Sequence, residues 1–211
     1  MEPQQYKQGF AVFCGRKFLV TPDVLIPRIE TEEIVRHCEE FATKQSSFIA
    51  DIGTGSGCLG ITLSLKLPDS TVYLSDISEK ALVIAKKNNR TDNTKFLISS
   101  LLNNYPKDLL FDVIVANLPY IPTDRIPTLD SSVKDFEPIL ALDGGPQGTT
   151  IINRLLQQLP RRLKNSGLAI LEIDDTHTLQ KFQIPNSMIG EVKKDQFNRN
   201  RFLLIRNKST V

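Results

Sequence analysis

The sequence predicts an α/β fold in which a mostly parallel sheet carries helices on both faces. From Ser47 onward, short apolar runs alternate with segments that have helical periodicity. The apolar runs are continuous, which is typical of strands that are buried on both faces of a parallel sheet. The chain has 211 residues, of which 40% are hydrophobic and 24% charged, so it can bury one sizeable core.

A short hairpin and a helix are predicted before the alternating part. The runs 10–13 and 17–20 flank a turn that is centred on Gly15. Residues 21–28 contain two prolines and are predicted to form an extended loop. We expect a helix to begin near Thr31, because two glutamates occupy its first turn and apolar residues then recur on one face.

The alternating part contains six recognisable strands and three longer helices. The strands are predicted at residues 48–50, 71–74, 95–98, 111–116, 168–173 and 202–205. The helices are predicted through Leu59, Leu63 and Leu67, after an N-cap at Ser78, and from Ile151 to Leu159. Residues 117–148 are rich in Pro, Asp and Gly, and we expect an irregular segment that carries function.

A glycine turn follows the first of these strands, in Asp51-Ile-Gly-Thr-Gly-Ser-Gly57. The dinucleotide pattern G-x-G-x-x-G also matches at Gly55–Gly60, but that frame begins inside the turn instead of at the strand end. An acid at this corner repels a pyrophosphate and attracts an aminoacyl ammonium, and the glycines let the backbone approach a ligand closely. The turn therefore favours S-adenosylmethionine over NAD.

Three strand ends carry the residues of one predicted site. Gly53, Asp76 and Asn117 each stand at or just after the carboxyl end of a strand, where open parallel sheets bind ligands. Asp76 can accept hydrogen bonds from both ribose hydroxyls, a role that suits either cofactor.

The segment Asn117-Leu-Pro-Tyr120 can hold a flat NH2 group. The Asn117 side-chain oxygen and the Leu118 carbonyl can each accept one N–H, and Tyr120 offers a ring for stacking. An amide nitrogen is a poor nucleophile, so most of the gain comes from orientation. A sulfonium is a good leaving group and requires no metal. Neither His37 nor His177 is expected to act as a catalyst.

These motifs resemble those of the HemK/PrmC class of protein-(glutamine-N5) methyltransferases, which act on the Gly-Gly-Gln glutamine of peptide chain release factors. The resemblance covers nearly the whole chain. It is carried by Phe18 to Glu32 with its Ile26-Pro-Arg28, the glycine turn, Asp76-Ile-Ser78, Phe111 to Ile121, Phe136-Glu-Pro138 and Ala141-Leu-Asp-Gly-Gly145.

The resemblance implies a Rossmann-like class I S-adenosylmethionine-dependent fold with a seven-stranded sheet, in which residues 47–211 form the methyltransferase domain. Residues 1–46 would form a hairpin, loop and helix packed on it. The resemblance also implies S-adenosylmethionine as the cofactor and S-adenosylhomocysteine as its product. The residues expected to contact them are Asp51, Gly53, Thr54, Gly55, Ser56, Gly57, Asp76, Ile77, Ser100, Leu101 and Asn117. The expected catalytic residues are Asn117, Leu118, Pro119 and Tyr120, joined in substrate binding by Arg28, Glu30 and Thr31. For Arg28, an ordinary loop ion pair is the competing interpretation.

Several positions depart from the family pattern. Leu118 replaces a proline of Asn-Pro-Pro-Tyr, Ile29 replaces another proline, and Ser100 stands where an acid is common. Gln147 stands before Gly148 where an aspartate is usual, and the segment Leu171-Glu-Ile-Asp174 lacks the expected glycine at its end. Bacterial members carry a helical N-terminal domain before this point, so we expect a trimmed, a naturally short or a diverged member.

Composition bounds the partners and the location. The net charge of +2 gives no sign of a nucleic-acid or membrane surface. No apolar run reaches the roughly 20 residues that span a bilayer, and no secretory signal is recognisable. The three cysteines lack metal-type spacing, which favours reduced thiols. We expect a cytoplasmic monomer that takes a release factor as its protein substrate.

Two alternatives stay open at this point. Enzymes that methylate exocyclic amino groups of nucleobases share the Asn117 motif, and the absence of a basic stripe opposes this reading. A non-catalytic, methyltransferase-like partner protein is the second alternative, motivated by Leu118 and Ser100.

Overall fold

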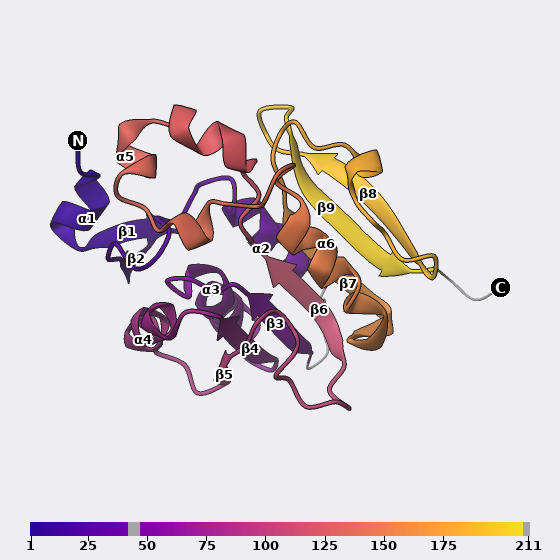
Figure 1. Ribbon diagram of the computed structural model, residues 1–211. Helices are drawn as coiled ribbons and strands as arrows, with labels where there is room; N and C mark the ends of the chain where they lie inside the picture. Colours follow the sequence, from indigo (N-terminus) through magenta and orange to yellow (C-terminus); the bar gives the residue numbers. More distant parts are fainter. Residues whose placement is uncertain (42–46, 209–211) are drawn as a thin grey trace.

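The computed structural model describes residues 1–41 and 47–208, and within them a seven-stranded sheet forms the centre of the molecule (Figure 1). Its order is β5-β4-β3-β6-β7-β9-β8. The strand bounds are β3 Phe48–Ile52, β4 Thr71–Asp76, β5 Thr94–Ile98, β6 Phe111–Ala116, β7 Leu163–Glu172, β8 Met188–Lys194 and β9 Asn200–Asn207. The pairs from β5 to β7 are parallel, whereas β9 is antiparallel to both β7 and β8. The predicted fold class is confirmed.

The winding of the chain reverses at the centre of this sheet. The chain starts at β3 and moves outward through β4 to β5, then returns to form β6 on the other side of β3. The helices that follow β3 and β6 therefore leave toward opposite faces, which opens a crevice at the carboxyl ends of these two strands.

Helices cover both faces of the sheet. Their bounds are α1 Gln4–Gln8, α2 Glu32–Phe41, α3 Cys58–Lys66, α4 Glu79–Asn88, α5 Ser131–Lys134, α6 Thr150–Leu156, η1 Thr123–Thr128, η2 Ile139–Ala141, η3 Leu159–Arg161 and η4 Leu179–Lys181. Side chains of β6 alternate between two cores: Ile114 packs with α6, and Val113 packs with α2 and α3. This two-sided burial explains the continuous apolar runs. Among the described residues, no helix combines the length and apolarity that a membrane span requires.

The hairpin of β1 (Phe10–Phe13) and β2 (Arg16–Leu19) lies against α4. The Asn88 side chain accepts a hydrogen bond from the Leu19 N–H at 2.7 Å and donates one to the Leu19 carbonyl at 3.0 Å. The hairpin is confirmed, as is the N-cap at Ser78, whose hydroxyl accepts from Ala81 N. The division into units 1–46 and 47–211 stays a prediction.

The structure adds elements that the periodicity did not indicate. α1 and the edge strand β8 were not predicted, and β7 begins five residues earlier than expected, at Leu163 rather than Leu168. β8 pairs with β9 at the sheet edge and carries Lys193 and Lys194, so it lacks the apolar run of a central strand. The segment 117–148 contains η1, α5 and η2, which are too short to show a helical period.

Candidate active site

A cavity of about 500 Å³ opens where the carboxyl ends of β3, β4 and β6 meet. Its lining includes the three residues that were expected to share a site, Gly53, Asp76 and Asn117. It also contains Thr31, Asp51, Thr54, Gly55, Ser56, Ile77, Ser100, Leu101, Leu118 and Pro119. The volume lies in the range of roughly 300–1,000 Å³ that is usual for small-molecule sites.

Residues 51–56 of the glycine turn form one wall of this cavity, whereas Gly57, an expected cofactor contact, is not part of the lining. Gly53 and Gly55 have φ of +72° and +55°, in the left-handed region that favours glycine. A Cβ on Gly53 would lie 2.9 Å from Leu118 Cδ2, so the two strand ends are in close contact there. A Cβ on Gly55 would meet no atom within 4 Å, which leaves its backbone open toward the cavity. This wall can accept a ligand at van der Waals distance from the main chain.

Asp51 lies at the base of the turn with 2% of its surface exposed. Its Oδ2 accepts hydrogen bonds from the Thr54 hydroxyl at 2.6 Å and from the Gly60 N–H at 2.9 Å. Burial raises the pKa of this carboxyl to about 7, against the opposing effect of the two hydrogen bonds. A cationic ligand group beside Asp51 would favour its ionised form, which fits an aminoacyl ammonium.

Asp76 ends β4 with its carboxylate fixed by two backbone amides. Oδ2 accepts from Gly55 N and Oδ1 from Ser78 N, each at 2.9 Å. Burial raises the pKa of Asp76, whereas the backbone hydrogen bonds lower it. Each carboxylate oxygen retains further acceptor capacity, so both ribose hydroxyls of a nucleoside can donate to it.

Ile77, Ser100 and Leu101 also line the cavity. Leu101 has φ +55°, an uncommon conformation for a residue with a branched side chain. The Ser99 hydroxyl donates to the Leu101 carbonyl at 2.7 Å and accepts from Asn104 N at 3.2 Å, which holds this turn. Together, apolar Ile77 and Leu101 suit a flat base.

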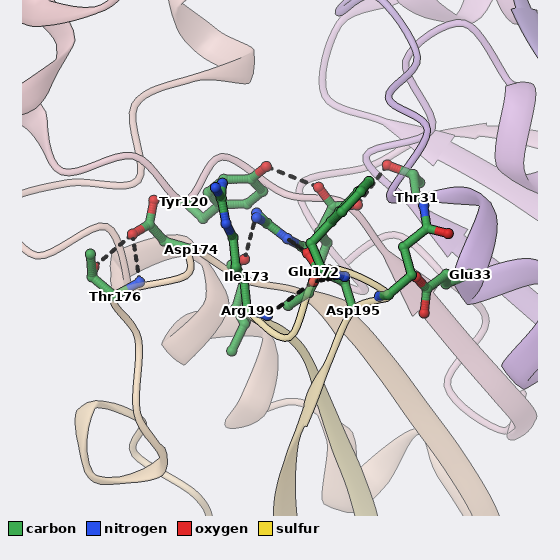
Figure 2. Close-up of polar contacts among 12 residues, drawn as sticks. Thr31, Glu33, Tyr120, Glu172, Ile173, Asp174, Thr176, Asp195 and Arg199 are labelled. Carbon is green, nitrogen blue, oxygen red and sulfur yellow. Dashed lines mark hydrogen bonds and ion pairs between the residues drawn. The ribbon is translucent and has the colours of Figure 1, made fainter.

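Asn117 belongs to a chain of hydrogen bonds that reaches into the sheet. Its Nδ2 donates to Thr31 Oγ1 at 3.0 Å, and the Thr31 hydroxyl donates to Glu172 Oε2 at 2.6 Å. The Tyr120 hydroxyl donates to the other oxygen, Glu172 Oε1, at 2.9 Å. Figure 2 shows Thr31 and Tyr120 approaching the Glu172 carboxylate from two sides.

Two expected substrate residues have protein partners instead of a place in the cavity lining. The Arg28 guanidinium forms an ion pair with Glu137 at 2.6 Å, and the Glu137 carboxylate also accepts from Ile26 N at 3.3 Å. The Tyr120 hydroxyl donates to Glu172. The pKa of Tyr120 is raised well above 10, mainly by burial and in addition by the Glu172 carboxylate. Neither residue lines the cavity, nor does Glu30, so their contacts with a substrate stay predictions.

The sequence interpretation missed Glu172, Glu137 and Ser99 as parts of the site. Glu172 is 1% exposed and stands near the end of the apolar run of β7, where an isolated acid is the signal that was available. Glu137 is 5% exposed and was noted solely as part of a family motif. In the part of the chain that the structure describes, no group of three or more His, Cys, Asp or Glu side chains is arranged to hold a metal.

Comparisons with known proteins agree with this geometry. Residues 9–128 match the family described as methyltransferase small domain. The chain is 41% identical over 175 residues to a release factor glutamine methyltransferase of Koribacter versatilis, covering 82% of this chain and 62% of that relative. A protein of the same name from Thermodesulfovibrio yellowstonii is 32% identical over 219 residues, covering 100% of this chain and 78% of its own length.

Among solved structures, the ribosomal protein L11 methylase of Lactobacillus delbrueckii subsp. bulgaricus superposes with a TM-score of 0.61 at 26% identity, over 86% of this chain and 81% of that one. Of the two relatives named above, the chain spans less than two thirds of the length of the Koribacter protein and more than two thirds of the length of the Thermodesulfovibrio protein. The glycine turn, Asp76 and Asn117 share one cavity, an arrangement that agrees with these matches. Because of these matches, the chain belongs to the release factor glutamine methyltransferase family.

Proposed function

We propose that this protein transfers a methyl group from S-adenosylmethionine to the side-chain amide nitrogen of a glutamine in a peptide chain release factor, within its Gly-Gly-Gln motif. The observation that carries the proposal is the shared cavity, which brings the glycine turn, Asp76 and Asn117 to one place. The names of the family members supply the substrate class.

The residues of the cavity fit this cofactor. The Asp76 carboxylate is fixed where it can accept ribose hydroxyls. Buried Asp51 lies at the base of the turn and lines the cavity, where an ammonium can face it. When bound, S-adenosylmethionine supplies an electrophilic methyl group on a sulfonium, and S-adenosylhomocysteine is the product. Ile77 and Leu101 offer apolar surfaces to the base.

The substrate amide is held by two acceptors at the end of β6. Asn117 commits its NH2 to Thr31, so its side-chain oxygen is left to accept an N–H from the substrate. The Leu118 carbonyl is the second acceptor in this proposal. Both hydrogen bonds strengthen as positive charge develops on the nitrogen, and they orient its lone pair toward the methyl group.

The mouth of the cavity suits a protein loop. Ile139 and Leu140 of η2 are 51% and 58% exposed and belong to the cavity lining. Exposed apolar side chains beside a binding site are typical of protein contacts. A net charge of +2 gives no electrostatic support to the nucleobase alternative.

Mass spectrometry of a release factor tests the proposal directly. We expect incubation with this protein and isotope-labelled S-adenosylmethionine to place one methyl group on the Gly-Gly-Gln glutamine, and Asn117→Ala to prevent it. A protein that binds the cofactor and leaves the release factor unmodified would contradict the substrate assignment. Modification of DNA or RNA, weakening steeply with salt, would support the nucleobase alternative instead.

We further propose that the protein acts in the cytoplasm, where translation factors are found. The expectation that it is a monomer stays a prediction, and sedimentation analysis of the free protein tests it.

A further inference from the structure

We propose that Glu172 is a positioning residue whose carboxylate, acting through the Thr31 hydroxyl, determines which end of the Asn117 amide faces the substrate. The inference depends on the proposed function, because that function assigns the free Asn117 oxygen to the glutamine N–H. It concerns a residue of β7 that lies 141 positions from Thr31 in the sequence.

The direction of each hydrogen bond in the chain follows from the one before it. An ionised carboxylate solely accepts, so the Thr31 hydroxyl gives its single proton to Glu172 Oε2 at 2.6 Å. The Thr31 oxygen is then an acceptor, and it receives the Asn117 Nδ2 donor at 3.0 Å. With its NH2 committed to Thr31, Asn117 turns its oxygen to the other side of the amide.

This orientation decides what the site can bind. The Asn117 oxygen can accept an N–H from the primary amide of glutamine. With the Asn117 amide turned by 180°, its NH2 would meet the substrate NH2, and two donors would face each other. A fixed direction also avoids the cost of ordering the amide when the substrate binds.

Thr31, Tyr120 and Arg201 each favour the ionised form of Glu172, against the effect of its burial. The Tyr120 hydroxyl donates to Oε1, so each carboxylate oxygen has its own donor. Arg201 of β9 favours the ionised form and is held by Asp195 at 3.3 Å, whereas Glu30 disfavours the ionised form. Figure 2 shows Glu172, at the end of β7, between Tyr120 and Thr31, which directly precedes α2.

The pH response follows from the burial of Glu172. Burial raises the pKa of its carboxyl against the hydrogen bonds of Thr31 and Tyr120 and the charge of Arg201. When the carboxyl is protonated it can donate to Thr31, and the direction of the chain is no longer determined. We therefore expect kcat to fall on the acid side, with a midpoint above the ordinary glutamate value.

Three variants test the inference. Thr31→Val keeps the shape of the side chain and removes the hydroxyl. We expect a 10- to 100-fold lower kcat, which is about the effect of losing one hydrogen bond to a charged group. Thr31→Ser restores the hydroxyl and is expected to recover most of this loss. Glu172→Gln removes the titrating group, so its kcat should no longer fall on the acid side. Cofactor affinity, measured with S-adenosylhomocysteine by calorimetry, should stay within about threefold in all three variants.

A readout without turnover separates this inference from the proposed function. The ¹⁵N–¹H signals of the Asn117 side-chain NH2, assigned by their loss in Asn117→Ala, should shift with pH in the unmodified protein. They should not do so in Glu172→Gln. Full kcat in Thr31→Val, or signals that Thr31→Val leaves unchanged, would overturn the positioning role. An unmodified protein that shows these shifts and methylates no release factor would refute the function alone.

Discussion

Replacing Asp51 with asparagine should make the free protein more stable at high pH and weaken its cofactor binding. The Asp51 carboxyl is buried, and its pKa is raised from 3.8 to about 7. The folded protein therefore holds this proton more tightly than the unfolded chain does. The resulting stabilisation is complete below pH 3.8 and is lost as the pH rises through about 7.

The size of the effect follows from the two pKa values. Between pH 5 and pH 8, the wild-type protein should lose about 3 kcal/mol of unfolding free energy through Asp51. Asparagine has no such proton, and its oxygen can still accept from Thr54 and Gly60 in place of Oδ2. For a chain of this size, the difference in Tm between variant and wild type should change by roughly 6–12 °C over that range.

Thermal unfolding by circular dichroism at pH 5, 6, 7 and 8 measures this difference. The difference in Tm between the two proteins at each pH cancels the titration of the groups that they share, and its change with pH removes the part of the substitution that does not depend on pH. Asp108→Asn is the matched control, because Asp108 is exposed. A plot of Tm against pH for this variant should run parallel to that of the wild type. Parallel curves for Asp51→Asn would refute the reasoning. S-adenosylhomocysteine should raise the Tm of Asp51→Asn less than that of the wild type, if Asp51 faces the ligand ammonium.

Three further results are expected. Asn117→Ala should lower kcat by at least about 100-fold and leave the cofactor Kd within a few-fold, whereas Asp76→Ala should raise that Kd. Equal loss of cofactor binding in both variants would contradict the assignment of Asn117 to the substrate and Asp76 to the cofactor. Leu140→Ser should raise the KM for a release factor and leave the cofactor Kd unchanged, because Leu140 is exposed at the cavity mouth; an unchanged KM would remove η2 from the docking surface. Arg28→Ala should lower the free energy of unfolding, measured in urea, by roughly 3 kcal/mol, because it leaves the Glu137 carboxylate buried without its cation. The double variant Arg28→Ala with Glu137→Gln should recover part of that loss. An unchanged free energy of unfolding in Arg28→Ala would show that the ion pair contributes nothing to stability.

The site was predictable where each residue is placed by its own strand. Gly53, Asp76 and Asn117 stand at strand ends, and a parallel sheet brings such ends to one edge. The side-chain partners were not predictable in the same way. Arg28 pairs with Glu137 across 109 positions of sequence, and no local pattern distinguishes this pair from an exposed charge that contacts a substrate.

The sequence alone determined the layered α/β fold, the glycine turn and the position of Asn117, because apolar periodicity and turn chemistry depend on neighbouring residues. Tertiary structure alone decided that the Tyr120 hydroxyl donates to Glu172 and that Thr31 links Asn117 to β7 through hydrogen bonds. It also decided that β8 pairs with β9 and forms the edge of the sheet. A hydrogen bond between distant segments exists once the fold has brought a donor and an acceptor within about 3 Å of each other. That distance depends on the packing of the whole chain.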